Sequence, residues 1–127
     1  MEGGQLDKRR SIIIIQARMS SSRLPGKTLM PINRKPMLEI IVNNLLKNVK
    51  IDDLVVATSK HKSDDLIFEF CKMKNFKVFR GSLFNVRDRF HKIAKKYKSD
   101  IIVRVTGDNV LTSPYYINCL LKYIKCN

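Results

Sequence analysis

The sequence of 127 residues is poor in the features that mark several classes of protein. It has five glycines and four prolines against a hydrophobic content of 44%, which excludes a disordered chain and indicates a globular one. Its apolar runs fall well short of the ~20 residues that a membrane-spanning helix needs. The length suffices for one domain with a hydrophobic core and not for two.

Cysteine is scarce, and its spacing is uninformative about metals. The three cysteines, Cys71, Cys119 and Cys126, form no C-x-x-C pair, and their odd number argues against a disulfide framework. Cys71 and Cys119 fall in segments with helical periodicity, where we expect free cysteine to pack as a small hydrophobic side chain. A reducing, cytoplasmic location is the natural expectation.

A secretory signal peptide is also not indicated. Cations at positions 8–10 precede four isoleucines, but Gln16 and Arg18 follow at once, and no small-residue cleavage pattern comes after them. We therefore predict a flexible amino-terminal segment at 1–10, and a buried strand at its end. Residues 11–127 then form a single folded unit.

Acidic residues are few: 11 stand against 25 lysines and arginines, for a formal charge of +14. Such a balance is typical of proteins that meet nucleic acid, anionic membranes or anionic small molecules. Most of the lysines fall on the polar faces of amphipathic segments, where solvation alone explains them. The chain has no tryptophan, zinc-finger spacing or aromatic RNA-binding strand, so only its charge supports a nucleic-acid-binding module.

Strand and helix patterns alternate along the chain. Runs rich in β-branched residues predict strands at 11–17, 54–58, 76–79 and 101–105. Apolar residues at helical spacing follow each of them, and the predicted helix starts are Pro36, Ser63, Asn85 and the pair Ser113-Pro114. We expect Leu66 and Leu120 on the inward faces of the second and fourth helices.

This order predicts an α/β fold with a mostly parallel sheet, right-handed crossovers and helices on both faces. Such sheets bind ligands beyond the carboxyl ends of their strands. The loops to consider are therefore 18–27, 59–63, 80–85 and 106–113. The fourth strand should leave one edge of the sheet unpaired.

The first of these loops has the chemistry of a phosphate site. Residues 18–27 combine three cations, three serines and Gly26 directly after a buried strand. A triphosphate is bound by backbone N–H groups, hydroxyls and cations of this kind. The spacing matches neither a P-loop nor a dinucleotide fingerprint, and a solvated basic loop is the alternative.

The same loop carries a family resemblance. Residues 15–27, IQARMSSSRLPGK, closely resemble the signature loop of the spore-coat-polysaccharide type of cytidylyltransferase, a relative of the CMP-sialate and CMP-Kdo synthetases. Further matching blocks follow in order over nearly the whole chain: KPMLE at 35–39, VVATS at 55–59, VFRGS at 78–82 and VRVTGD at 103–108. The resemblance implies a three-layer, Rossmann-like sheet of the nucleotide-diphospho-sugar transferase type, truncated here after about four strands.

The resemblance also implies roles for individual residues. Arg18 and Lys27 would contact the CTP phosphates and act in catalysis. The remaining nucleotide contacts would come from Ala17, Ser21, Ser22, Arg23, Arg80, Gly81, Ser82 and Thr106. The pair Asp88-Arg89 also resembles a pair in the family, although an exposed pair on a helix face is an equal alternative.

Asp108 is the expected metal ligand. It follows a buried strand and a glycine at the mouth of the sheet, where an acid has no packing role. Magnesium prefers carboxylate and phosphate oxygens, and the matching aspartate of the family holds the ion that bridges the CTP phosphates. A turn residue or a helix N-cap is the alternative for Asp108.

By resemblance, the reaction is transfer of CMP from CTP to a sugar or sugar acid, with release of pyrophosphate, in surface polysaccharide biosynthesis. Relatives are about twice as long; their second half completes the sheet and supplies another carboxylate, the sugar pocket and a homodimer surface. We expect no turnover from these residues alone. A non-catalytic nucleotide-binding remnant is the main alternative, because Ser20 stands where relatives carry a glycine that permits close approach or positive φ.

Overall fold

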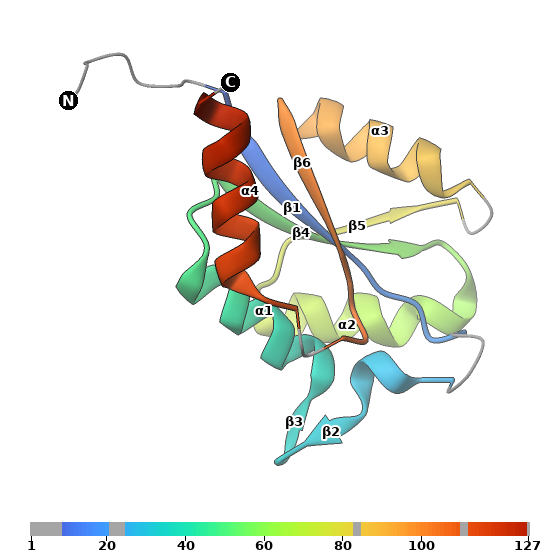
Figure 1. Cartoon of the computed structure of the whole chain (residues 1–127). Helices are drawn as coiled ribbons and strands as arrows, with labels where there is room; N and C mark the ends of the chain where they lie inside the picture. The colour runs from blue at the N-terminus through green and yellow to red at the C-terminus, as the bar shows by residue number, and fades with distance from the viewer. Residues whose placement is uncertain (1–8, 21–24, 83–84, 110–111, 127) are drawn as a thin grey trace.

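Strands and helices alternate in the structure, a computed structural model that describes residues 9–20, 25–82, 85–109 and 112–126. Four parallel strands form one sheet in the order β5–β4–β1–β6 (Figure 1). The strands are β1 (Ser11–Gln16), β4 (Asp53–Ser59), β5 (Val78–Gly81) and β6 (Ile101–Thr106). The helices are α1 (Met37–Asn48), α2 (Asp65–Lys74), α3 (Val86–Lys96) and α4 (Pro114–Cys126). The predicted α/β class and the parallel sheet are confirmed.

The isoleucine side chains of β1 pack on both faces of the sheet, because successive side chains of a strand point in opposite directions. Ile13 and Ile15 pack in a core with residues of α1, α2 and α4. Ile12 and Ile14 pack with Ile93 of α3 in a second, smaller core. Helices therefore cover both faces, as the unbroken apolar run predicted, with α3 alone on one side (Figure 1).

The strand order reverses at β1. The chain moves from β1 to β4 and β5 on one side, and then returns to place β6 on the other side of β1. Gln16, the last residue of β1, lies opposite Ala57 of β4 and Thr106 of β6. The loops after β1 and β6 thus begin side by side at the switch point, where open α/β sheets bind ligands. Among the described residues β6 pairs only with β1, so the predicted open edge is present.

Two predicted helix caps are confirmed. The side chain of Asn85 accepts the backbone N–H of Asp88 at 2.9 Å. Ser113 Oγ accepts the N–H of Tyr116 at 3.4 Å in the first turn of α4. Pro36 stands one position earlier than expected, at the N-cap of α1.

The predicted N-cap at Ser63 is wrong. Helix α2 begins at Asp65, after a short 3₁₀ turn at Lys62–Asp64. The side chain of His61 caps this turn, since its Nδ1 accepts the N–H of Ser63 at 3.0 Å. Ser63 therefore lies within a turn that the helical periodicity did not reveal.

The strand predicted at 76–79 begins later and ends later than expected. Asn75 closes α2 in the left-handed conformation, with φ at 61°, and the N–H of Phe76 donates to the carbonyl of Cys71 at 2.9 Å. Because Phe76 still belongs to the helix terminus, pairing with β4 starts at Val78 and continues to Gly81.

Three side chains predicted to face inward are exposed. Leu66 is 62% exposed and Leu120 is 55% exposed. Cys119 is also exposed, unlike the buried Cys71. The apolar stripes of α2 and α4 are wider than their contact with the sheet, so only Ile67, Cys71, Ile117 and Leu121 are buried there.

A small hairpin lies between β1 and α1. Strands β2 (Pro31–Ile32) and β3 (Lys35–Pro36) pair antiparallel around Asn33 and Arg34. Both turn residues have positive φ, at 51° and 70°. A two-residue hairpin turn requires this conformation, which glycine adopts at least cost.

Most of the predicted flexible segment 1–10 lies outside the described residues. Arg9 and Arg10 are described. Arg9 Nη2 donates to the carbonyl of Ile124 at 3.0 Å, and the N–H of Arg10 donates to Asp100 Oδ2 at 2.8 Å.

Candidate functional site

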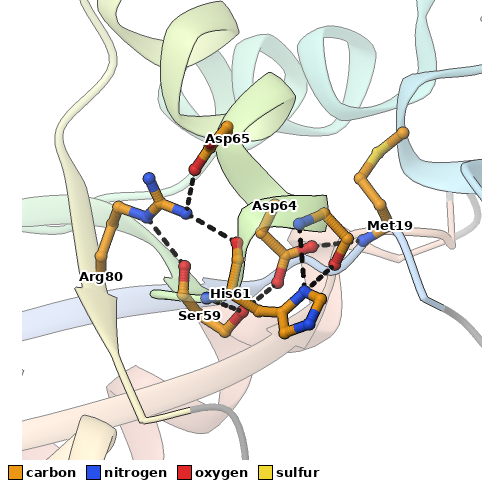
Figure 2. A network of polar contacts seen from close by, with 7 residues as sticks. Met19, Ser59, His61, Asp64, Asp65 and Arg80 are labelled. Atoms are coloured by element: carbon orange, nitrogen blue, oxygen red, sulfur yellow. Dashed lines mark hydrogen bonds and ion pairs between the residues drawn. The ribbon is translucent and has the colours of Figure 1, made fainter.

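A buried carboxylate attaches the loop after β1 to the loop after β4. Asp64 is fully buried, and its Oδ1 accepts the backbone N–H of Met19 at 2.8 Å. Its Oδ2 accepts a short hydrogen bond from the hydroxyl of Ser59, the last residue of β4 (Figure 2). The start of the first loop is therefore held at a defined position beside β4. The sequence indicated Asp64 only as a residue that suits a helix N-terminus, because a buried acid and an exposed one look alike there.

A second connection joins the first loop to the loop after β6. Thr28 is buried, and its Oγ1 donates to the carbonyl of Gly107 at 2.6 Å. The N–H of Gly107 donates to the carbonyl of Gln16 at 2.8 Å. A Cβ at position 107 would lie 3.0 Å from the Cβ of Ala17 and 3.1 Å from Thr28 Oγ1, so a larger residue there would require these neighbours to shift. Ala17 itself is buried against this junction.

Gly26 closes the first loop. Its φ is 78°, and its N–H donates to the carbonyl of Met19 at 2.7 Å. The left-handed conformation explains a glycine at this position. Both ends of the loop are thus fixed to each other and to the sheet. Ser20 is exposed, and it is not among the described residues with positive φ, so a serine there needs no left-handed backbone.

The cations of the first loop lie at the switch point. Arg18 comes two residues after Gln16, and Lys27 begins the 3₁₀ turn Lys27–Leu29 that follows Gly26. Both side chains are half-buried, and neither makes an ion pair with an acid in the described part of the chain. Cations that have no acidic partner among the described residues suit an anionic ligand at this edge of the sheet. The predicted residues Ser21, Ser22 and Arg23 lie outside the described residues.

Arg80 is held by the loop after β4. Its Nε donates to the carbonyl of Ser59 at 2.8 Å, and its Nη2 donates to the carbonyl of His61 at 3.0 Å. The same Nη2 lies 2.8 Å from Asp65 Oδ1 (Figure 2). The guanidinium also lies over the ring of Phe68. These contacts give Arg80 a role in fixing the loop. A contact between Arg80 and a nucleotide stays a prediction.

The remaining residues predicted after β5 and β6 lie at the same edge. Ser82 is exposed, and its Oγ accepts the N–H of Asn85 at 3.2 Å. Thr106 is exposed at the end of β6, opposite Gln16. Both residues therefore lie at the carboxyl edge of the sheet, Thr106 at the switch point and Ser82 after the edge strand β5, and their contacts with a ligand stay predictions.

Arg89 is the residue that sequence reasoning undervalued. It is 1% exposed, which contradicts the alternative of an exposed pair with Asp88 on a helix face. Asp88, by contrast, is half-buried and pairs with Lys92 at 3.0 Å. The side chain of Arg89 passes over Gly81, since a Cβ on that glycine would lie 2.2 Å from Arg89 Cγ. Gly81 is thus a glycine because an arginine occupies the space of its side chain.

The guanidinium of Arg89 has no hydrogen-bond partner in the described part of the structure. Its Nε, Nη1 and Nη2 are all buried and unpaired. Burial lowers the pKa of Arg89 below its ordinary value, the charge of Arg18 lowers it further, and the carboxylate of Asp64 opposes the shift. Arg18 and Asp64 therefore lie near enough to Arg89 for their charges to act on it.

Asp108 lies on the β6 side of the switch point. It comes two residues after Thr106, just as Arg18 comes two residues after Gln16, and its side chain is half-buried. The described residues contain no cluster of three or more histidine, cysteine or acidic side chains. A single carboxylate still fits magnesium, which is commonly bound by one or two carboxylates together with substrate phosphates.

The fold and the site define a class: an open, parallel α/β protein with a cationic loop and a carboxylate at the topological switch point. A family model described as Cytidylyltransferase matches residues 12–127, and the chain belongs to this family. It is 39% identical over 115 residues to the spore coat polysaccharide biosynthesis protein SpsF of Bacillus subtilis, covering 87% of this chain and 48% of that protein.

Solved structures agree with this assignment. A cytidylyltransferase from Leptospira borgpetersenii superposes with a TM-score of 0.87 at 36% identity, covering 94% of this chain and 50% of that one. A CMP-2-keto-3-deoxy-manno-octonic acid synthetase complexed with CTP superposes with a TM-score of 0.77 at 27% identity, covering 93% and 48%. The chain therefore spans about half the length of the relatives that it matches.

Proposed function

We propose that this chain is the nucleotide-binding half of a cytidylyltransferase that transfers CMP from CTP to a sugar or sugar acid. The observation that carries the proposal is the fixed geometry of the first loop. Asp64 and Thr28 attach this loop to the loops after β4 and β6, so Arg18 and Lys27 start from the same edge of the sheet as Asp108.

The cations would bind the phosphates of CTP. Arg18 and Lys27 have no competing ion pair in the described residues, so a polyphosphate meets positive charge without first displacing an acid. The backbone around them is held by the hydrogen bonds of Met19, Gly26 and Thr28. Fixed cations of this kind stabilise the charge that develops on a transferring phosphoryl group.

Asp108 would hold magnesium together with phosphate oxygens. When bound, the ion supplies charge neutralisation and orientation of the phosphates. The protein side chains would contribute positioning: Ala17 and Gly107 pack closely at the base of the site, and the loop cations would orient the α-phosphate.

In the proposed reaction a hydroxyl oxygen of the acceptor attacks the α-phosphorus. A new oxygen–phosphorus bond forms, the bond between the α-phosphorus and its bridging oxygen breaks, and pyrophosphate leaves. The hydroxyl proton passes to solvent or to a base. No covalent enzyme intermediate is needed, since positioning and electrostatics supply the catalysis.

The biological setting follows from the relatives. One of them is named for spore coat polysaccharide biosynthesis, and another for a CMP-linked sugar acid. We therefore propose a role in surface polysaccharide biosynthesis, in the cytoplasm, with a homodimer as the assembly if a full-length form exists. None of the described helices is long and apolar enough to cross a membrane. A non-catalytic remnant that binds nucleotide remains the second candidate, because the chain spans about half of its relatives.

Binding and turnover are measured separately. Thermal unfolding with CTP, UTP, GTP and ATP, each with and without magnesium, tests recognition of the nucleotide. At a ligand concentration 100 times its Kd, we expect a stabilisation of about 2.7 kcal/mol for CTP. Pyrophosphate release is then assayed with 2-keto-3-deoxy-manno-octonic acid and neutral sugars. Release shows that these residues turn over by themselves; CTP binding without release shows that they supply the nucleotide site alone; and equal shifts for all nucleotides, or none, contradict CTP recognition.

A further inference from the structure

We propose that Arg89 is a phosphate-binding residue of the nucleotide site, one that the free protein holds as an unpaired internal cation. The inference rests on the proposed function, because it adds a residue to the same site. It starts from the buried state of the side chain: all three guanidinium nitrogens are enclosed, and none donates a hydrogen bond within the described structure.

An enclosed guanidinium without acceptors is costly, because the side chain has lost water and gained no partner. The fold nevertheless makes room for it, since Gly81 lacks the Cβ that would collide with Arg89 Cγ. Asp64, the acid whose charge acts on Arg89, does not satisfy it. Both carboxylate oxygens of Asp64 accept hydrogen bonds from Met19 and Ser59. Arg89 thus retains all of its donors for a group that the free chain does not contain.

The location identifies the chemistry of that group. Arg89 lies over the end of β5, and the charge of Arg18, after β1, acts on it. Two cations that repel each other in the free protein are both stabilised by an anion between them. Guanidinium groups bind phosphate oxygens through two parallel N–H bonds, which matches a di- or triphosphate better than an uncharged sugar or base.

The test compares Arg89→Met with Arg87→Met. Both changes remove one positive charge from the first turn of α3, but Arg87 is exposed. The probes are sodium pyrophosphate, CTP with magnesium, and cytidine, and the readouts are the melting temperature without ligand and the Kd of each probe.

We expect Arg89→Met to melt at or above the wild-type temperature, because an unpaired buried charge is gone. Its Kd for pyrophosphate and CTP should rise tenfold or more, as expected for the loss of charge-assisted hydrogen bonds. Arg87→Met should bind as the wild type does.

Two results overturn the proposal: an unchanged pyrophosphate Kd in Arg89→Met, or a loss of affinity confined to cytidine. If Arg89→Met is destabilised or does not fold, an NMR measurement on the wild type decides. The side-chain Nε–H resonance of Arg89 is assigned by its absence from the spectrum of Arg89→Lys. The resonance must shift as pyrophosphate is added, and an unchanged position at saturation refutes the inference.

The inference and the proposed function fail in different ways. If wild type and Arg89→Met are equally stabilised by CTP, the function stands and the inference fails. If pyrophosphate binding depends on Arg89 while CTP binds no better than UTP, the phosphate site stands and the recognition of cytidine fails.

Discussion

The carboxylate of Asp64 accepts the backbone N–H of Met19 across 45 positions of sequence, at 2.8 Å and out of contact with solvent. Through this bond, the loop that begins at the end of β1 takes its position from the turn that follows β4. The adjacent Ser59 hydroxyl fixes the second oxygen of the same carboxylate. A site at the sheet edge is thereby assembled from parts that are far apart in sequence.

Asp64→Ala should therefore weaken both the fold and the site. The change leaves the N–H of Met19 and the hydroxyl of Ser59 without their acceptor, at a cost of about 3 kcal/mol in the free energy of unfolding. Urea unfolding measures this loss, and CTP titration measures the weakened binding expected from a loose first loop. Asp88→Asn is the matched control, because its ion pair with Lys92 is partly solvated and worth less than about 0.5 kcal/mol. Equal effects of the two changes would refute the role given to Asp64.

Two buried threonines should respond in opposite directions to replacement by valine. Thr28 donates its hydroxyl proton to Gly107, so Thr28→Val should lower the free energy of unfolding by about 1.5 kcal/mol. Thr58 is equally buried, but its hydroxyl has no partner in the described structure. Thr58→Val removes an unsatisfied polar group, and it should leave stability unchanged or raise it. Both are measured in the same denaturant series, and a destabilised Thr58→Val contradicts the assignment.

The turn of the β2–β3 hairpin carries strain that a glycine relieves. Arg34 has a φ of 70°, a conformation that costs a residue with a Cβ about 1 kcal/mol. Arg34→Gly should thus raise the melting temperature by roughly 4 °C. Lys35→Gly, one position later in an extended strand, should lower it instead, because glycine only adds freedom to the unfolded chain there. A fall in the melting temperature of Arg34→Gly contradicts the turn geometry.

The three thiols should differ sharply in reactivity. Burial raises the pKa of Cys71 to about 12, so almost none of it is thiolate at pH 8. Cys119 and Cys126 are exposed on α4. Iodoacetamide at pH 8 should modify the two exposed cysteines of the folded protein and reach Cys71 only in denaturant, as mass spectrometry of tryptic peptides can show. Rapid labelling of native Cys71 is the contrary result.

The sheet could be predicted from sequence because its signals are local. Four consecutive isoleucines before a polar loop indicate a strand buried on both faces, and the strand forms as expected at Ser11–Gln16. The hairpin at 31–36 escaped prediction because its strands have two residues each, too few to show a period. Leu66 and Leu120 were misplaced for another reason: helical spacing marks an apolar face, and only tertiary contact decides how much of that face is covered.

The residues of the site also differ in whether a local sequence pattern marks them. The cationic loop and Asp108 are visible in sequence because each follows a predicted strand directly. Asp64 and Arg89 are not, since both look like ordinary residues of an exposed first helical turn. Their burial depends on where the loops after β4 and β5 meet the loop after β1, which no local pattern encodes. Gly81 is a partial signal of the buried arginine. The need for a glycine there becomes clear only in the structure, where Arg89 occupies the space of its side chain.

The most direct test of the central claim is calorimetric titration of the chain with CTP and with cytidine, in magnesium, for the wild type, Lys27→Met and Asp108→Asn. If the first loop and Asp108 form a polyphosphate site, CTP binds at least tenfold tighter than cytidine, about 1.4 kcal/mol or more. Lys27→Met should remove most of that difference, and Asp108→Asn should remove the dependence on magnesium. Equal binding of CTP and cytidine, or CTP binding that neither substitution changes, would contradict the account.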